Sequence, residues 1–565
     1  MIRYIPRKTK VKMELLPHVT LADVLIGAVC VAILIALLTS NLAYKWFIAL
    51  GALGFMVLLY VPLADGERAY YTTVLLFRFF AFKKKYSRDK VKGYENIRQL
   101  IPYEHIVDDK YLDYGEYFGM VLRIIPVEFF LLTEDKQDMY INSFKNALTR
   151  LNADQDCELV KINKAVLYDD YIEDDEKKYA ALMEAAEQGE INDRELEGRT
   201  FVFQSRVTQY IEANENNRLY EDCYYLVVFD KDKTTLYDTV EGMQTDLASG
   251  QTPIHSKICN AKDLAIFLKA NYTKEFNERD TETKGAESLV EWTMPEKVQF
   301  KTNHIIVDGK EYRQFCISDY PLQVGNAWAY NIFSMPATKC VVKIKPMMRF
   351  DAEKEVDNAI LEMETKTMYS ARESKQIENE THLQTLRKLL VDIKNSNENL
   401  YKCNFFITCE DYMKKEMRAL LRQYGFKASE MFGRQVDAFV SSNVSRINTI
   451  KDHVRGINAT PLSGMFPFIS NTINDPGGFY LGYNANGRVF VNFFRRDEER
   501  VNSNMMIIGK SGGGKSFATK DILSNMAGDN SRIFVLDPES EYVNLAHNLG
   551  GKTIDVGSGL SGRIN

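Results

Sequence analysis

Two long apolar stretches lie near the N-terminus of this chain. Residues 20–38 are apolar apart from Asp23, and residues 42–63 are apolar apart from Lys45 near their start. Each stretch is about as long as a helix that crosses the hydrocarbon core of a bilayer. Because only a short polar connection separates them, the pattern predicts a hairpin of two membrane-spanning helices. Two helices buried in a protein core are the alternative.

Basic residues flank this hairpin on both sides. Residues 1–12 contain five lysines and arginines, residues 68–92 contain eight, and the connection contains none. By the positive-inside rule, both ends of the hairpin and the domains that follow lie in the cytoplasm, with residues 1–92 anchored in a bacterial inner membrane. A second apolar stretch directly after the first argues against a cleaved signal peptide.

A third apolar segment, residues 74–82, is rich in phenylalanine and is followed by Lys83, Lys84 and Lys85. Aromatic side chains at headgroup depth and lysines on anionic lipid are typical of a segment in the membrane interface. The same basic stripe could instead contact DNA.

A large region at residues 93–475 has the signals of a mixed α+β domain. Apolar runs predict strands at residues 121–132, 224–229 and 403–409, and helical spacing predicts helices at residues 136–151 and 410–424. Residues 169–197 are strongly acidic, which predicts a solvated helix-loop-helix excursion that needs no ligand.

Residues 351–424 contain neither glycine nor proline, and an intermittent apolar stripe with helical spacing runs through their first half. A single helix over residues 351–394 would be about 65 Å long. Such a helix could pair with a partner chain in a coiled coil or pack against its own domain.

Alternating strands at residues 478–483 and 488–493 flank the turn Asn484-Ala485-Asn486-Gly487. This arrangement predicts a β-hairpin. Asp475-Pro476-Gly477 stands in front of it and marks a domain boundary, so that residues 476–565 form the last domain.

The strongest chemical signal is a glycine-rich octapeptide that fits the phosphate-binding pattern G-x-x-x-x-G-K-[ST] at every fixed position. Its glycines let successive N–H groups point at phosphates, Lys515 would reach the β- and γ-phosphates, and the Ser516 hydroxyl would ligate Mg²⁺. An apolar strand at residues 505–508 and a helix at residues 517–526 give the loop its usual setting. A chance glycine-rich turn is the alternative. The residues expected to hold ATP are Gly509, Lys510, Ser511, Gly512, Gly513, Gly514, Lys515, Ser516 and Phe517.

Acidic residues end the next predicted strand, at residues 531–539. Ligands of open α/β sheets bind beyond the carboxyl ends of strands, so Asp537 and Glu539 are candidate catalytic residues beside Lys515. The alternative is that Asp537-Pro538-Glu539 only turns the chain.

The sequence continues for only 49 residues after the octapeptide, from residue 517 to residue 565. A helix at residues 541–549 and a strand at residues 552–556 would complete about half of a RecA-like P-loop domain, which normally exceeds roughly 150 residues. A second acidic motif is not found in the sequence. We therefore expect an incomplete ATPase domain that binds ATP weakly and hydrolyses it slowly.

Charge is distributed unevenly along the chain. Residues 1–92 contain 14 lysines and arginines against five acidic residues, a net charge of +9, whereas the whole chain carries −6. The remainder therefore carries −15 and does not suit a general binder of phosphate backbones. The eight cysteines form no C-x-x-C pair and suit a reducing compartment.

The order of these parts resembles the conjugative type IV secretion ATPases of the VirB/TrbE/CagE type. The resemblance rests on ATPLSGMFPF at residues 459–468, the loop GKSGGGKSF, DPESEY at residues 537–542 and the final Gly562-Arg563-Ile564-Asn565. The apolar hairpin resembles small inner-membrane subunits that some Gram-positive conjugation systems fuse to this ATPase. Residues 93–475 match in architecture more than in motif.

The resemblance implies a membrane-associated, hexameric ATPase that uses ATP and Mg²⁺ to energise channel assembly or the transport of DNA and protein. Its partners would be other type IV secretion channel and coupling subunits. Two other classes stay open. One is a DNA-translocating motor of the septal translocase or HerA type, and the other is a membrane scaffold that docks channel partners without hydrolysing ATP.

Overall fold

The structure is a computed structural model. It describes residues 3–5, 14–16, 19–40, 44–61, 68–130, 132–165, 168–216, 220–282, 284–368, 373–395, 398–470, 473, 475, 478–484, 487–496 and 500–556. The chain forms two compact units, each described here by itself. Unit 1 comprises Met1–Asn163 and Asp222–Ile469, and unit 2 comprises Lys164–Glu221 and Ser470–Asn565.

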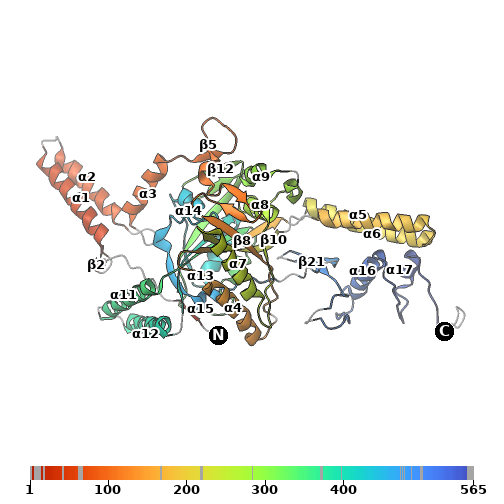
Figure 1. Ribbon diagram of the computed structural model, residues 1–565. Helices are drawn as coiled ribbons and strands as arrows, with labels where there is room; N and C mark the ends of the chain where they lie inside the picture. Colours follow the sequence, from red (N-terminus) through yellow and green to blue (C-terminus); the bar gives the residue numbers. More distant parts are fainter. Residues whose placement is uncertain are drawn as a thin grey trace. The chain divides into compact units, whose positions relative to one another are not determined.

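Unit 1 is built on a 15-stranded sheet (Figure 1). Its strands are β4 (Lys85–Ser87), β5 (Glu95–Asn96), β6 (His105–Val107), β7 (Tyr111–Asp113), β8 (Phe118–Ile124), β9 (Asp156–Ala165), β10 (Tyr220–Asp230), β11 (Ser256–Ile258), β12 (Lys297–Phe300), β13 (Ile305–Val307), β14 (Lys310–Asp319), β16 (Thr338–Pro346), β17 (Leu400–Glu410), β18 (Lys427–Ser429) and β19 (Arg455–Asn458). The main path runs β5-β4-β12-β13-β14-β17-β16-β9-β10-β8-β7-β6. Two small pairs lie apart from it, β1 (Arg3–Tyr4) with β15 (Gln323–Val324) and β2 (Glu14–Leu16) with β3 (Val19–Thr20).

The centre of the sheet is formed by β16, which pairs in antiparallel register with both β17 and β9. Because successive side chains of a strand point to opposite faces, a central strand must be apolar on both. Val342 and Ile344 accordingly lie in one core, and Val341 lies in the other.

Helices bury their apolar stripes against both faces of this sheet. The first core contains side chains of α4 (Glu134–Thr149), α7 (Lys233–Ala248), α10 (Tyr330–Phe333), α13 (Lys414–Gln423) and α15 (Ala459–Ser463). The second core contains side chains of α8 (Ala261–Ala270), α9 (Ala286–Thr293) and α14 (Gln435–Ser441). Each fully buried leucine or phenylalanine contributes about 1.5–3 kcal/mol, so these two layers supply most of the stability of unit 1.

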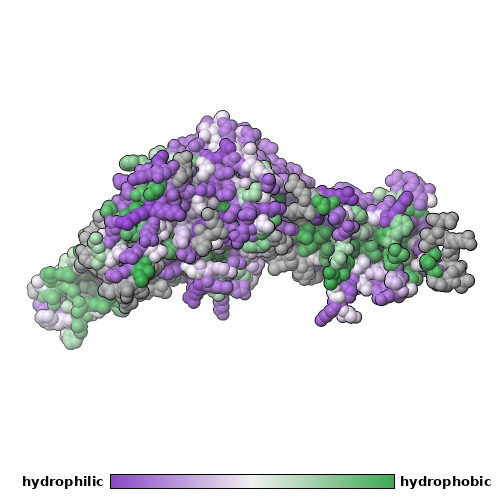
Figure 2. All heavy atoms as spheres, turned by 90° about the horizontal axis from the view of Figure 1, so that it is seen from below, coloured by the Kyte–Doolittle hydropathy of each residue, from purple (hydrophilic) through white to green (hydrophobic). Residues whose placement is uncertain are grey.

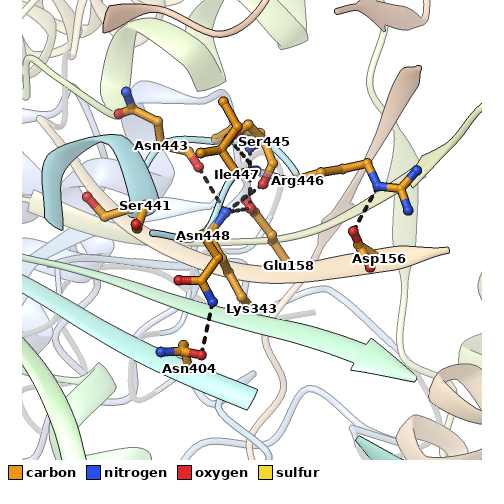
Figure 3. Close-up of polar contacts among 12 residues, drawn as sticks. Asp156, Glu158, Lys343, Asn404, Ser441, Asn443, Ser445, Arg446, Ile447 and Asn448 are labelled. Carbon is orange, nitrogen blue, oxygen red and sulfur yellow. Dashed lines mark hydrogen bonds and ion pairs between the residues drawn. The ribbon is translucent and has the colours of Figure 1, made fainter. Parts of the chain in front are cut away.

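A buried ion pair joins the sheet to the loop after α14 (Figure 3). Lys343 of β16 donates to Glu158 of β9 and, at 2.5 Å, to the carbonyl oxygen of Ser445. The Ser445 N–H donates to the same Glu158 oxygen at 3.3 Å. Glu158 is 1% exposed, and its burial raises its pKa while the Lys343 charge works in the opposite direction. The pair therefore fixes an irregular segment to two central strands.

The single helix predicted for residues 351–394 is wrong. The structure has two helices, α11 (Arg349–Met368) and α12 (Glu373–Asn395). They pack against each other through a small core that includes Val356, Ile360 and Leu389, and Arg387 pairs with Glu364 at 2.8 Å. The apolar stripe is thus buried between α11 and α12 of the same chain, which agrees with the alternative that this region packs against its own domain.

The membrane hairpin predicted for residues 20–63 is also wrong. In the part of the chain that the structure describes, no helix is long and apolar enough to cross a bilayer. The helix α1 (Leu21–Thr39) holds the buried Asp23 in its first turn, with Arg68 at 3.6 Å and the Tyr70 hydroxyl at 3.1 Å. The helix α2 (Lys45–Leu59) has only 15 residues, or about 22 Å. The inner-membrane location deduced from this hairpin is therefore not supported.

The helices α1 and α2 nevertheless expose much of their apolar surface, as the hydrophobic patch at the left end of Figure 2 shows. Leu25 is 61% exposed, Trp46 70% and Phe47 77%. Because so little apolar area is removed from water, packing between these two helices contributes little to the stability of unit 1.

The segment predicted to lie in a membrane interface forms the helix α3 (Ala69–Ala81). Phe79 is buried, and Arg78 pairs with Asp437 of α14 at 3.2 Å. Lys83 pairs with Glu95, and the Lys84 ammonium lies over the Phe80 ring, 4.7 Å from its centroid. These side chains thus have partners within unit 1.

Unit 2 consists of two segments that are far apart in the sequence. The first forms the helical hairpin of α5 (Asp169–Glu187) and α6 (Asp193–Asn216), drawn in yellow in Figure 1. The second forms the β-hairpin of β20 (Phe479–Asn484) and β21 (Gly487–Val491) and the helices α16 (Lys515–Gly528) and α17 (Val543–Asn548). The predicted β-hairpin, the two predicted helices after the octapeptide and the predicted helix-loop-helix are confirmed as elements.

Three strands predicted for the last domain are not formed in its described residues 500–556. Residues 505–508, 531–539 and 552–556 have no strand partner there, and their apolar side chains are exposed, with Ile508 at 84%, Phe534 at 94% and Leu536 at 99%. A strand needs a hydrogen-bonded neighbour, which an apolar run in the sequence does not supply.

Candidate nucleotide-binding site

The octapeptide forms a tight loop whose backbone requires glycine at two positions. Gly512 and Gly514 have φ angles of 73° and 83°, in the left-handed region that residues with a Cβ rarely adopt. Gly514 is also the N-cap of α16, so the helix begins at Lys515. The backbone conformation of the loop therefore requires glycine at both positions.

The loop closes on the carbonyl oxygen of Lys510. This oxygen accepts from the Gly513 N–H and from the Lys515 ammonium, each at 3.1 Å. A Cβ on Gly513 would lie only 3.0 Å from this oxygen, so a larger residue would force the carbonyl group to shift. The Lys515 ammonium group thus lies across the loop and closes it.

The start of α16 adds further donors for an anion. The first N–H groups of an α-helix have no partner within the helix, and they carry the positive end of the helix dipole. Lys515, Ser516 and Phe517 occupy these positions, and the first turn contains no acidic side chain. Backbone donors, one cation and a hydroxyl at the second helical position form the donor set that the phosphates of ATP and their Mg²⁺ need, and the residues present fit these groups.

Asp537 lies in a turn before α17 rather than at the end of a strand. Its carboxylate accepts from the Tyr542 N–H at 2.8 Å and from the Glu539 N–H at 3.2 Å, and these backbone hydrogen bonds lower its pKa. This is the arrangement expected of a residue that turns the chain. Glu539 is exposed, and the catalytic roles of both residues stay predictions.

The sequence reasoning missed a cluster that holds the segment leading to the loop. Asp475 is 4% exposed and accepts from Arg495 at 2.8 Å and from the Asn492 N–H at 2.9 Å. It also accepts from Arg500, which stands shortly before Gly509. The sequence around Asp475 indicates only a turn at a domain boundary. Because the paired arginines follow the β-hairpin in sequence, no local pattern indicated that they would meet this carboxylate.

Residues 497–559 match a protein-family model described as the central domain of the helicase HerA. A HerA-type domain, from a family of P-loop ATPases, therefore lies near the C-terminus. The match includes the glycine-rich loop, α16 and both candidate acidic residues. No curated protein matches the chain.

Proposed function

We propose that this chain binds ATP and Mg²⁺ at residues 509–516 and works as an ATP-driven translocation motor of the HerA type. The glycine-rich loop at the start of α16, inside the HerA-type domain, carries the proposal. An enzyme of the ATPase kind is consistent with both observations.

Each group of the loop has a distinct task in this proposal. The N–H groups of residues 512–517 bind the phosphate oxygens, and the Lys515 ammonium exchanges the Lys510 carbonyl for the β- and γ-phosphates. The Ser516 hydroxyl holds the metal. A Mg²⁺ ion held by Ser516 would supply positive charge to the phosphates during transfer. Asp537 or Glu539 would orient the attacking water or a metal-bound water.

Conjugative type IV secretion is the more specific setting that we propose for this motor. The order of a large α+β region, the segment at residues 459–468 and the nucleotide loop supports it. In the structure this segment contains α15, and Phe466 and Phe468 lie in the first core of unit 1. Of the two other motifs, DPESEY forms the turn before α17, and residues 562–565 lie outside the described residues. Channel and coupling subunits and further copies of the chain, as a hexamer, would be its partners.

A motor that acts directly on duplex DNA is the second candidate, and the HerA-type match favours it. The two settings differ in what stimulates ATP hydrolysis. Duplex DNA should stimulate a DNA-translocating motor, whereas a secretion ATPase should respond to its channel subunits. The net charge of −15 outside residues 1–92 argues against strong binding to DNA without a partner.

The test is ATP binding and turnover by the full chain with the Lys515→Ala variant. Lys552→Ala is the matched control, because this exposed lysine belongs to the same domain but lies outside the loop. We expect the wild type to bind ATP weakly and hydrolyse it slowly, Lys515→Ala to abolish both, and Lys552→Ala to change neither. Equal ATP binding by the wild type and Lys515→Ala would overturn the proposal. ATP binding without turnover, together with capture of channel subunits that Lys515→Ala leaves unchanged, would favour the non-hydrolysing scaffold.

A further inference from the structure

The α5–α6 hairpin packs closely against the helices that follow the nucleotide loop. A Cβ on Gly528, at the end of α16, would lie 2.9 Å from a methyl group of Val202 in α6. A Cβ on Gly550, just after α17, would lie 2.7 Å from the Glu195 backbone nitrogen in α6. Glycine at these positions lets α6 approach the C-terminal ends of both helices (Figure 1).

Basic side chains of the α5–α6 hairpin contact the C-terminal end of α16, where the helix dipole is negative. Asp529 is the C-cap of this helix, where a carboxylate is unfavourable because the helix dipole is also negative there. The Arg206 guanidinium of α6 lies 3.4 Å from the Asp529 carboxylate, and the Lys178 ammonium of α5 lies 3.2 Å from the same carboxylate. Arg199 donates to the Gly528 carbonyl oxygen at 3.3 Å, one of the carbonyls that a helix end leaves without a partner.

Arg206 is itself held in place from its own hairpin. It is 7% exposed, donates to the buried Asp175 of α5 at 2.5 Å, and lies over the Phe203 ring, 5.0 Å from its centroid. Both terminal nitrogens of this buried guanidinium donate to carboxylates, which fixes its direction. The Arg206 guanidinium group therefore connects both helices of the hairpin to the end of α16, in addition to the contacts of Lys178 and Arg199.

Aromatic rings tie the base of the same hairpin to the β-hairpin that precedes the loop. Tyr168 and Tyr210 stack with their centroids 5.6 Å apart, and Tyr171 stacks on Phe490 of β21 at 4.3 Å. Tyr480 of β20 contacts Tyr168 edge-on at 5.7 Å. The α5–α6 hairpin thus contacts the elements on both sides of the nucleotide loop.

We propose that Arg206 is a positioning residue for the nucleotide loop and acts through Asp529 at the far end of α16. A helix of 14 residues is a stiff rod of about 21 Å, so the position of its C-terminal end sets the direction in which Lys515 and Ser516 leave its N-terminus. The inference rests on the proposed function, because it assigns the loop to ATP. The inference adds that the α5–α6 hairpin, which lies between β9 and β10 in the sequence, is required for the geometry of the nucleotide loop.

The test compares nucleotide affinity in the full chain, with a fluorescent ATP analogue as the probe. We expect Arg206→Met to weaken binding about tenfold, which corresponds to roughly 1.4 kcal/mol. Arg206→Lys should recover part of the loss. Asp529→Asn by itself should also weaken binding, and adding it to Arg206→Met should cause little further loss, because the same contact is then already missing. Lys177→Met is the control, since this exposed lysine of α5 pairs with Glu173 within its own helix.

The outcomes separate the inference from the proposed function. Wild-type affinity in Arg206→Met, with binding abolished in Lys515→Ala, would overturn the positioning role alone. Equal binding by Lys515→Ala and the wild type would overturn the proposed function. If Arg206→Met does not fold, the double variant with Asp529→Asn decides. A double variant that folds but binds the analogue about tenfold more weakly than the wild type supports the inference, and a double variant that folds and binds with wild-type affinity contradicts it.

Discussion

Asp475 accepts hydrogen bonds from both terminal nitrogens of the Arg500 guanidinium, at 2.6 and 2.8 Å. Such a bidentate pair fixes direction as well as distance. It connects the residue in front of β20 to a residue shortly before the glycine-rich loop. The β-hairpin and the loop entry therefore belong to one fixed arrangement within unit 2.

Replacing this carboxylate should loosen unit 2. Asp475→Asn removes the charge that holds two arginines, and we expect a loss of about 2 kcal/mol in the free energy of unfolding. All three tryptophans, Trp46, Trp292 and Trp328, lie in unit 1, so amide hydrogen exchange of β20 and β21 is the measurement to use. The control is Glu541→Gln, an exposed carboxylate of the same unit.

The Asp475 cluster also predicts how unit 2 responds to acid. Burial works to raise the pKa of Asp475, but the hydrogen bonds and charges of Arg500, the Asn492 N–H and Arg495 together lower it below its usual value. A lowered pKa means that this stabilisation is complete above about pH 4 and is lost as the pH falls through the folded-state pKa. In the wild type, the protection of the β20 and β21 amides against hydrogen exchange should decrease as the pH is lowered below about 4. The decrease should be smaller in Asp475→Asn. An equal decrease in both would contradict the assignment.

Lys343→Met should destabilise unit 1 strongly. The change leaves the buried Glu158 charge without its cation, and breaking such a pair costs about 3–5 kcal/mol. Urea unfolding followed by tryptophan fluorescence measures this, because Trp292 and Trp328 lie in unit 1. Lys345→Met on the same strand is the matched control, since Lys345 is 53% exposed and should contribute less than about 1 kcal/mol. Similar effects of the two variants would show that the buried pair has no special role.

Because of Lys274, the stability of unit 1 should change with pH in the alkaline range. Burial lowers the pKa of Lys274 to about 8 although Glu410 lies 2.8 Å away. Between about pH 8 and 10.5 the unfolded chain binds more protons at this lysine than the folded chain, so this group makes stability rise with pH in that window. The difference in thermal midpoint between wild type and Lys274→Met should therefore shift in favour of the wild type from pH 8 to pH 10. A difference that does not change with pH would contradict the lowered pKa.

Gly514→Ala should impair nucleotide binding without unfolding the chain. The φ angle of 83° makes alanine strained by about 1–2 kcal/mol, which the loop can relieve only by changing its path. The control is Gly285→Ala, because Gly285 caps α9 at a φ of −75° with open space around a Cβ. Binding of the fluorescent ATP analogue and the thermal midpoint together separate a local change of the loop from loss of the fold. Unchanged affinity in Gly514→Ala would contradict the glycine requirement at the N-cap.

Local signals in the sequence predicted local features well. The Asn-Gly pair, the glycine pattern before Lys515 and the apolar run at residues 224–229 each specify an element within a few residues, and the structure contains the corresponding β-hairpin, helix start and central strand. The strand predicted at residues 121–132 begins earlier and ends at Ile124, because the chain leaves the sheet before Pro126.

Features that depend on a distant partner were not predictable from the sequence. The acidic composition of residues 169–197 suggested a solvated excursion, yet Asp175 is buried against Arg206, and α6 packs on α16. Asp23 stands in the sequence as a single acidic residue in an apolar run, but Arg68 and Tyr70 contact it in the folded chain. In each case the deciding partner lies many residues away, where no periodicity connects the two.

The position of the α5–α6 hairpin in the sequence has a consequence for how the chain is assembled during synthesis. About 250 residues separate Glu221 from Ser470, so the hairpin leaves the ribosome long before the strands and helices that cover Tyr168, Tyr210 and Arg206. For that interval its aromatic base has no cover from β20 and β21. A fragment that starts at the β-hairpin would have the opposite deficiency, with Tyr480 and Phe490 uncovered. Expression of the nucleotide-binding part by itself should therefore need residues 164–221 joined to it.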